Sequence, residues 1–435
     1  MRKVALTTLG CKVNQYETEA IREIFVKEGY EVVPFESLAD IYVINTCTVT
    51  NMGDKKSRHM ILRAKKENKD AIIAVIGCYA QIAWEEICKI EGVNVILGTK
   101  NKSDILYYIN KAIVEKKQQI CIKEVLKDDK FENLNINDYS YKSRAFIKIQ
   151  DGCNKFCSYC LIPYARGAVC SKEPESILKE AKELVSNGFK EIILSGIHTA
   201  SYGIDFKIKY DLLDLLDDLE AIEGITRIRI GSMDPVFFTS NNIKRLSGFK
   251  KLCPHFHISL QSGCNATLAR MNRHYTGDFF KELVENLRKS IKDISITTDV
   301  IVGFPGETKE EFNITYNLLK ELQLSKMHIF KFSPRKGTKA QLMPNQVEPK
   351  LKDERSEILI NLDKKLEETF INKFIGREFQ VLFENNTHLE ENLYCGYTPN
   401  YIKAVVSSKD NIAHKIFFVK LIKNMADSAF GEIRN

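Results

Sequence analysis

Two stretches of the chain alternate short apolar runs with charged, amphipathic segments, and this alternation constrains the fold more than any other feature of the sequence. The first stretch occupies the N-terminal quarter. Its apolar runs cover residues 4–8, 41–45, 72–76 and 93–97, and helical spacing covers residues 17–28 and 55–69. Short apolar runs separated by helices are typical of buried parallel strands. The sequence therefore predicts an N-terminal doubly wound α/β domain.

The second stretch has the same alternation with longer segments, and a C-terminal segment without helices follows it. Its strand candidates are residues 145–149, 191–195, 227–231, 257–260, 297–302 and 328–332. Six βα units predict a partial (β/α)6 barrel rather than a full barrel of eight. A long polar helix is predicted over 350–373. The last segment contains strand candidates with no helices between them, at 379–383, 401–406 and 416–422, which predicts a small all-β barrel.

We therefore expect an α/β protein with three domains and a linker. The predicted bounds are 1–115 for the N-terminal domain, 116–141 for a charged linker without periodicity, 142–373 for the partial barrel and 374–435 for the small β-barrel. No apolar run approaches the ~18 residues needed to cross a bilayer, and the N-terminus has no secretory signal, so we expect a cytoplasmic protein without a membrane partner. The 64 basic and 57 acidic residues give a net charge of +7, too mild a bias to predict nucleic-acid binding by itself.

Three cysteines with Cys-x3-Cys-x2-Cys spacing follow the first predicted barrel strand: Cys153, Cys157 and Cys160, called the loop cysteines below. Barrels place their chemistry at this rim. A [4Fe-4S] cluster normally takes four thiolates, so three ligands would leave one iron open to a molecule that is not protein. Zinc would need a fourth ligand, and the nearest candidates, Cys170 and His198, lie at no familiar zinc spacing. Disulfides are disfavoured in a chain with twelve cysteines and no export signal.

Three further cysteines each follow a predicted strand of the N-terminal domain: Cys11, Cys47 and Cys78, called the strand-end cysteines below. The carboxyl ends of parallel strands line one crevice, so these thiols would converge and could hold a second cluster. Their interpretation as small buried hydrophobic residues is equally open from position alone. The remaining cysteines have no mutual metal spacing and are interpreted as buried or incidental thiols: Cys88, Cys121, Cys170, Cys253, Cys264 and Cys395.

The cysteines and their surroundings resemble those of a known family. The loop spacing is similar to that of radical S-adenosylmethionine (SAM) enzymes. Together with residues 9–18, 45–58 and 77–81, it resembles the methylthiotransferase family along essentially the whole chain, including a C-terminal barrel similar to the RNA-binding TRAM domain. The resemblance implies two [4Fe-4S] clusters, an auxiliary one on the strand-end cysteines and a radical-generating one on the loop cysteines.

The resemblance also implies the chemistry. Two SAM molecules would be used per turnover, one giving a methyl group to cluster-bound sulfur and the other being cleaved to a 5'-deoxyadenosyl radical that abstracts hydrogen from an unactivated C–H bond. The cofactors carry this chemistry, so no catalytic residue is expected beyond the cluster ligands. The sequence does not identify the electron donor.

Several residues fit a SAM cradle. Phe156 and Tyr159 lie within the cysteine loop, although loop aromatics that merely cover a cluster are an equal alternative. Gly196, Ser232 and Gln261 lie at predicted strand ends, on the reactive rim. Gly303 resembles the segment that flanks adenine in radical SAM barrels, although alone it reads as a structural Gly-Pro turn. The whole candidate set is therefore Phe156, Tyr159, Gly196, Ser232, Gln261 and Gly303.

The substrate is indicated by residues 12–16, 48–51, 274–276 and 332–338, which resemble the branch of the family that acts on N6-threonylcarbamoyladenosine at position 37 of tRNA. Isopentenyladenosine of tRNA and an aspartate of a ribosomal protein stay open as substrates. A non-catalytic RNA-binding metalloprotein is the more distant alternative. Residues 376–435 carry seven basic and seven acidic side chains, so net charge gives the expected RNA-binding barrel no support. Cys170 occupies a position where relatives have a basic residue, which puts a substrate contact there in doubt.

Overall fold

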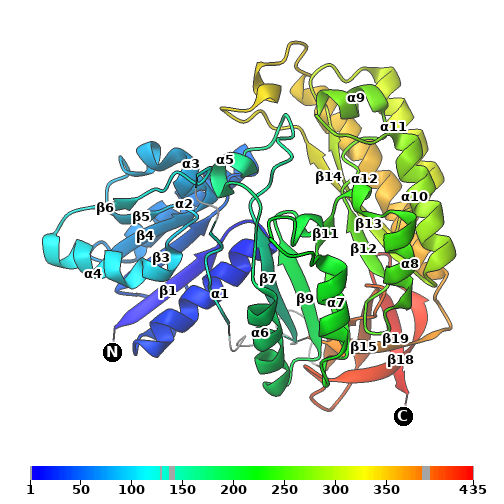
Figure 1. Cartoon of the computed structure of the whole chain (residues 1–435), viewed down its shortest axis with the longest axis horizontal. Coiled ribbons are helices and arrows are strands. Elements are labelled where there is room, and N and C mark those ends of the chain that lie inside the picture. The colour runs from blue at the N-terminus through cyan, green and yellow to red at the C-terminus, as the bar shows by residue number, and fades with distance from the viewer. Residues whose placement is uncertain (1, 128–129, 137–142, 385–391, 435) are drawn as a thin grey trace.

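A computed structural model describes residues 2–127, 130–136, 143–384 and 392–434 of the chain (Figure 1). It has three parts, a parallel-sheet domain at the N-terminus, a partial barrel and a small closed β-barrel at the C-terminus. In Figure 1 the N-terminal domain lies beside the partial barrel, with helix α1 (Lys12–Lys27) at the junction, where it packs against strand β7 (Arg144–Asp151). The predicted α/β class is confirmed. Among the described helices, none is long and apolar enough to cross a membrane.

The N-terminal sheet is wholly parallel, with strand order β2-β1-β3-β4-β5-β6. Helices α1 and α4 bury one face, and α2 and α3 bury the other, which is the doubly wound arrangement expected from runs of apolar residues buried on both sides. The strands are β1 (Lys3–Thr8), β2 (Glu31–Val33), β3 (Ile41–Thr46), β4 (Ile72–Gly77), β5 (Val93–Leu97) and β6 (Gln119–Cys121). The other helices are α2 (Asn51–Glu67), α3 (Cys78–Ile87) and α4 (Ile105–Glu115).

Two edge strands of the N-terminal sheet were not predicted, and one of them lies within the range predicted as the linker. Strands β2 and β6 have three residues each, too few to show a period. Strand β6 lies inside the range predicted as linker, so the N-terminal sheet extends into it. Leu134 and Ile136, further along the same range, are buried in the core of the partial barrel. Residues 128–129 and 137–141 of the predicted linker, and residue 142 at the predicted start of the partial barrel, lie outside the described residues.

The partial barrel is built from two four-stranded sheets, ordered β10-β9-β7-β8 and β11-β12-β13-β14. Strands β10 and β11 meet at Gly231, so together they fill one position, and six parallel positions result, as predicted. The strands after β7 are β8 (Cys170–Ser171), β9 (Glu191–Gly196), β10 (Arg227–Ile230), β11 (Ser232–Met233), β12 (His255–Ile258), β13 (Ser295–Val302) and β14 (Lys326–Lys331). The helices are α5 (Ile162–Arg166), α6 (Pro174–Ser186), α7 (Leu212–Glu220), α8 (Ser240–Gly248), α9 (Asn265–Arg270), α10 (Gly277–Ser290) and α11 (Lys309–Leu322).

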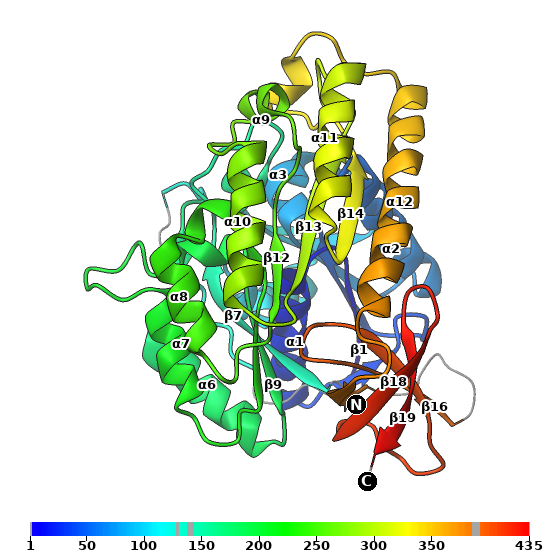
Figure 2. The ribbon, with the colours of Figure 1, turned by 90° about the vertical axis from the view of Figure 1, so that its right-hand side faces the viewer.

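Helix α12 (Pro349–Asn372) connects the partial barrel to the C-terminal barrel, and Figure 2 shows it running down to that barrel. The C-terminal barrel is closed in the order β15-β16-β17-β19-β18, and closure removes the exposed sheet edges. Two of its strands, β16 and β19, were not predicted because their apolar residues are interrupted by glycine and polar positions. The strands are β15 (Glu378–Phe383), β16 (Leu393–Tyr397), β17 (Lys403–Ser407), β18 (Ile416–Asn424) and β19 (Ala429–Arg434).

Candidate functional site

The loop cysteines lie directly after β7, at the carboxyl end of the barrel strands. The loop is held in a tight turn, because the Cys153 amide donates to the Gly167 carbonyl and the Cys160 amide donates to the Cys157 carbonyl, each at 3.0 Å. All three cysteines line one cavity of about 140 Å³. The fold therefore places three sulfur donors around a single space at the reactive rim.

The electrostatics of this cavity suit a cationic group bound by the thiols. Burial raises the pKa of Cys160 to about 12, and the neighbouring Cys157 and Cys153 raise it further. The Arg273 guanidinium, 3.5 Å from the Cys157 sulfur, is the only cation that touches a loop cysteine in the part of the chain that the structure describes. Thiols that resist ionisation by themselves become thiolates when a metal is bound. The residues thus fit a cluster with three protein ligands.

A single metal ion fits less well. Among the described residues no group of three His, Cys, Asp or Glu side chains comes close enough to hold one ion. A cube of four irons takes each thiolate at a different corner, so its ligands are more widely spread than those of zinc. The geometry does not favour the zinc alternative.

Three of the six predicted cradle residues line the cavity of the loop cysteines: Tyr159, Ser232 and Gln261. Tyr159 packs its ring edge-to-face with Phe304, at 6.2 Å between centroids. Gly196 ends β9, and the two residues after it, Ile197 and His198, line the cavity in its place.

The other two predicted cradle residues lie elsewhere. Phe156 is 42% exposed and packs against Tyr164 rather than into the cavity. Gly303 has a φ of +70°, and a Cβ there would lie 2.3 Å from the Lys352 side chain of α12. Gly303 therefore forms a turn closed against α12, and it does not line the cavity of the loop cysteines.

Three polar residues of the cavity, His198, Asp234 and Arg273, were not predicted as cradle residues. His198 Nε2 lies 3.3 Å from the Asp234 carboxylate, and Arg273 lies 3.8 Å from the same carboxylate. The pKa of Asp234 falls to about 2; burial would raise it, but the bond with His198 and the charge of Arg273 outweigh burial. His198, Asp234 and Arg273 come from loops after three different strands, so no local spacing in the sequence could have connected them.

The strand-end cysteines follow three strands that are neighbours in the sheet, β1, β3 and β4. Cys11 caps α1, Cys47 follows β3, and Cys78 begins α3. Gly10, with a φ of +100°, brings the turn before Cys11 so close that a Cβ would lie 2.7 Å from the Cys47 sulfur. Burial raises the pKa of Cys78 to about 12, and the charges of Cys11 and Cys47 contribute in the same direction. The three thiols therefore converge and fit a second set of cluster ligands.

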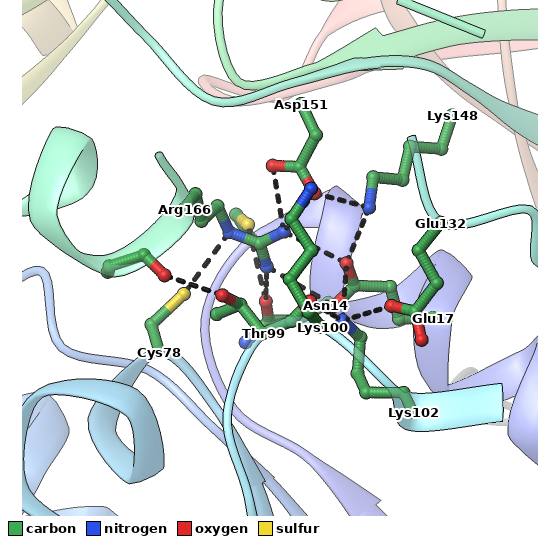
Figure 3. A network of polar contacts seen from close by, with 12 residues as sticks. Asn14, Glu17, Cys78, Thr99, Lys100, Lys102, Glu132, Lys148, Asp151 and Arg166 are labelled. Atoms are coloured by element: carbon green, nitrogen blue, oxygen red, sulfur yellow. Dashed lines mark hydrogen bonds and ion pairs between the residues drawn. The ribbon is translucent and has the colours of Figure 1, made fainter. Parts of the chain in front are cut away.

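Arg166 joins the two halves of the site, and sequence reasoning did not single it out. It ends α5, shortly after the loop cysteines, and is fully buried. Its Nε lies 3.2 Å from the Cys78 sulfur, and its Nη2 donates to Asn14 at 2.7 Å (Figure 3). Its Nη1 lies 2.9 Å from Glu17 and 3.0 Å from Asp151. One barrel side chain thus binds a cysteine and a carboxylate of the N-terminal domain.

Lysines complete this buried network (Figure 3). Lys148 lies 2.7 Å from Glu17 and 2.6 Å from Asp151, and Lys102 lies 2.7 Å from Glu132. Three cations therefore face three carboxylates, which is the compensation that buried charges require. We call these residues the junction network: Glu17, Lys102, Glu132, Lys148, Asp151 and Arg166.

Cys170 lies beside the junction network and not on an open surface. Its side chain is 1% exposed, and the Lys100 ammonium lies 3.8 Å from its sulfur. Lys100 also donates to the Lys130 carbonyl. A direct substrate contact from Cys170 is therefore sterically excluded in this conformation.

Comparisons with known proteins agree with this architecture. A family model described as the Radical SAM superfamily matches residues 147–319, and one described as Uncharacterized protein family UPF0004 matches residues 3–98. Over 76% of this chain and 73% of the other, the fold is similar to the radical SAM methyltransferase TsrM of Kitasatospora setae, with a TM-score of 0.55 at 15% identity.

Curated relatives cover almost the whole chain. The sequence is 44% identical to the threonylcarbamoyladenosine tRNA methylthiotransferase MtaB of Bacillus subtilis, over 97% of this chain and 94% of the relative. It is 42% identical to the MtaB of Aquifex aeolicus, over 90% of this chain and 95% of the relative. It is 36% identical to the tRNA-2-methylthio-N(6)-dimethylallyladenosine synthase of Clostridium tetani, over 98% of this chain and 95% of the relative.

The partial barrel with its three-cysteine loop thus defines a radical SAM enzyme, a class that uses SAM and a [4Fe-4S] cluster. Within that class, the N-terminal domain and the full-length similarity to the curated relatives identify the family. The chain belongs to the methylthiotransferase family.

Proposed function

We propose that this protein transfers a methylthio group to C2 of N6-threonylcarbamoyladenosine at position 37 of tRNA, giving the 2-methylthio derivative. The observation that carries the proposal is the pairing of two three-cysteine sets from different domains, joined through Arg166, which follows one set and lies 3.2 Å from the Cys78 sulfur of the other. An enzyme that only generated a radical would need one set. A second set beside it provides a place for the sulfur to be transferred.

The two sets of cysteines have different proposed roles. The loop cysteines would hold a [4Fe-4S] cluster that takes SAM as its non-protein ligand, and the strand-end cysteines would hold an auxiliary [4Fe-4S] cluster. When bound, these groups supply radical generation and sulfur delivery, with two SAM molecules used per turnover and an electron donor still to be identified. Tyr159, Ser232 and Gln261 contact SAM in the cavity that they share with the loop cysteines.

Arg273 and His198 would act together with Asp234 in that cavity. Both side chains contact the same carboxylate, and Arg273 also lies 3.5 Å from the sulfur of Cys157. We propose that they orient SAM and exclude water, and that neither transfers a proton.

The modified base is proposed from the relatives. The two most similar of those named above act on threonylcarbamoyladenosine according to their names. The dimethylallyladenosine synthase of Clostridium tetani, at 36% identity, makes isopentenyl-type adenosine the second candidate. A ribosomal-protein aspartate stays a more distant candidate.

Mass spectrometry of tRNA nucleosides tests this proposal. A deletion strain should lose 2-methylthio-N6-threonylcarbamoyladenosine and accumulate the unthiolated nucleoside, and the plasmid-borne gene should restore the product. A variant with the loop cysteines changed to Ala is the matched control, and it should not restore it. Loss of the isopentenyl product instead would favour the second candidate, and unchanged nucleosides would refute both.

A further inference from the structure

A second cavity, distinct from that of the loop cysteines, lies between the partial barrel and the C-terminal barrel. Its volume is about 520 Å³, within the range of ~300–1,000 Å³ that small-molecule sites occupy. Barrel strands β12, β13 and β14 supply one wall through residues at their amino-terminal halves, and α12 and the C-terminal barrel supply the other. Lys12 of α1, the residue directly after Cys11, also lines it.

Lys12 has no acidic partner within salt-bridge distance among the described residues. Its ammonium lies 5.7 Å above the Phe146 ring. The other cations nearby are already compensated, because Arg229 pairs with Glu191 at 2.9 Å and Arg144 pairs with Glu384. Lys12 is therefore an unpaired positive charge at the solvent-accessible edge of the cavity.

The two acidic residues that line the cavity do not compensate Lys12. Glu367 pairs with Lys326 at 2.6 Å, and Asp427 accepts a hydrogen bond from Ser428 at 3.0 Å. Lys403, a third lysine of the lining, has no acidic partner in the described part of the chain either. The lining of the cavity therefore carries a net positive charge, with three lysines and two carboxylates.

The positive charges around the cavity also act on Tyr401, a residue of the C-terminal barrel. Its ring stacks on His255 at 4.5 Å and on Tyr397 at 4.8 Å. Burial would raise the pKa of the phenol, but the charges of Arg144, Lys12 and Arg229 lower it below its ordinary value. Tyr401 also has a φ of +69°, a conformation that costs an aromatic residue energy and is found mostly where function requires it.

His255 supplies one buried polar atom without a partner. Its side chain is 6% exposed and lines the cavity, and its Nδ1 has no hydrogen-bond partner. Its Nε2 lies 3.3 Å from the Thr297 hydroxyl. A buried polar atom left unpaired destabilises the fold unless a ligand or water completes it.

We infer that this cavity binds the threonylcarbamoyl arm of the modified adenosine, with Lys12 pairing with its carboxylate. The inference rests on the proposed function. An isopentenyl arm is apolar and would leave the Lys12 charge uncompensated, so the same cation that favours the acidic arm acts against the apolar one. His255 and Tyr401 offer further hydrogen-bonding groups to the polar arm. Lys12 is thus a specificity-determining residue rather than a catalytic one.

Binding to synthetic anticodon stem-loops tests the inference without turnover. The anaerobically reconstituted full chain, without reductant, is titrated with three stem-loops that carry at position 37 threonylcarbamoyladenosine, its methyl ester, or unmodified adenosine. Lys12→Met should weaken binding of the acid by about 10- to 100-fold, the contribution of a hydrogen bond to a charged group. Binding of the ester and of unmodified adenosine should not change, and Lys12→Arg should restore part of the loss.

Lys27→Met is the matched control, because Lys27 lies on the same helix and is also exposed, but it lies outside the cavity lining and beside Glu23 at 3.6 Å. It should bind all three stem-loops as the wild type does. An equal loss for all three stem-loops with Lys12→Met would overturn the inference in favour of a backbone phosphate contact. SAM affinity lost with stem-loop binding intact would overturn it in favour of the methionine carboxylate of SAM. Unchanged binding of the acid would also overturn it.

Failure of this inference is separable from failure of the proposed function. If wild-type protein makes the 2-methylthio-N6-threonylcarbamoyl product and Lys12→Met binds the acid normally, only the role of Lys12 is wrong. If wild-type protein makes no such product, the proposed function fails first and takes the inference with it.

Discussion

Replacing Arg166 by Met should weaken the junction between the two halves of the site, because it removes one of three cations from the junction network. Breaking a buried ion pair by removing one partner costs ~3–5 kcal/mol, since the other charge stays buried. Glu17 and Asp151 would each keep Lys148, at 2.7 and 2.6 Å, so we expect the lower end, about 3 kcal/mol. That is a large part of the ~5–15 kcal/mol that stabilises a typical native protein.

Urea unfolding measures this loss. The only tryptophan, Trp84, lies on α3 with Cys78 and reports on the N-terminal domain by fluorescence. With an m-value of ~2–3 kcal/mol per molar urea, the midpoint should fall by about 1 M or more. Arg245→Met is the control: Arg245 pairs with Asp214 and Asp217 at the surface, where an ion pair contributes ~1 kcal/mol at most.

The pH dependence of Arg166→Met adds a second test. Burial raises the pKa of Glu17, but Arg166, Lys102 and Lys148 together hold it well below its ordinary value. A lowered carboxyl pKa contributes stability above the unfolded-state value, ~4.3, and this contribution is lost as pH falls through the folded-state value. With Arg166 removed, acid unfolding should begin at higher pH. A midpoint shift no larger than that of Arg245→Met, with unchanged acid unfolding, would refute the reasoning.

Three further predictions concern the thiols, one turn and one carboxyl. Anaerobic reconstitution should give about eight irons per chain if both sets of cysteines hold four-iron clusters. Changing the strand-end cysteines to Ala should halve the iron content and abolish methylthiolation. Reductive cleavage of SAM by that variant should stay measurable by chromatography. Gly303→Ala should cost at least ~1–2 kcal/mol, because a φ of +70° disfavours any Cβ and the new Cβ would lie 2.3 Å from the Lys352 side chain; a thermal melt that matches the wild type would contradict this. Burial raises the pKa of Asp363 to about 6, so its folded form binds the proton more tightly than the unfolded chain. Wild type should therefore gain stability relative to Asp363→Asn as pH falls from 7 to 5, and parallel melting curves at both pH values would exclude this.

The parts of the fold that sequence reasoning predicted are those whose signal is local. The apolar runs of β3, β4 and β5 are continuous because both faces of the sheet are covered, and their predicted bounds agree with the structure within one residue. The two sets of cysteines were singled out from local signals, the Cys-x3-Cys-x2-Cys spacing of one set and the position of the other after three strands, and their role as cluster ligands stays a prediction. Short edge strands such as β6 have no comparable signal.

The junction network could not be predicted, because its members are distant in the chain. Lys148 and Glu17 are separated by 131 positions and Arg166 and Glu17 by 149. Each of these residues is an ordinary charge in its own segment, and charged residues are usually exposed. Only the docking of α1 against β7 makes them a buried set. His198, Asp234 and Arg273 were missed for a similar reason, because the closure of the partial barrel brings together loops that are distant in the chain.

Helix α1 carries two charges that the fold treats in opposite ways. Glu17 has three cations within 3.6 Å and is completely buried, so neutralising its partners should cost stability. Lys12, one turn and a half earlier, lines a cavity and has no acidic partner within salt-bridge distance among the described residues, so its removal breaks no ion pair. We therefore expect Lys12→Met to leave the urea midpoint unchanged or to raise it, within ~0.5 kcal/mol, although it weakens binding of the acidic arm. A residue that binds a ligand at no benefit to the fold is expected at a specificity site. If Lys12→Met destabilised the protein as much as Arg166→Met does, Lys12 would be structural and its role in recognition would have to be abandoned.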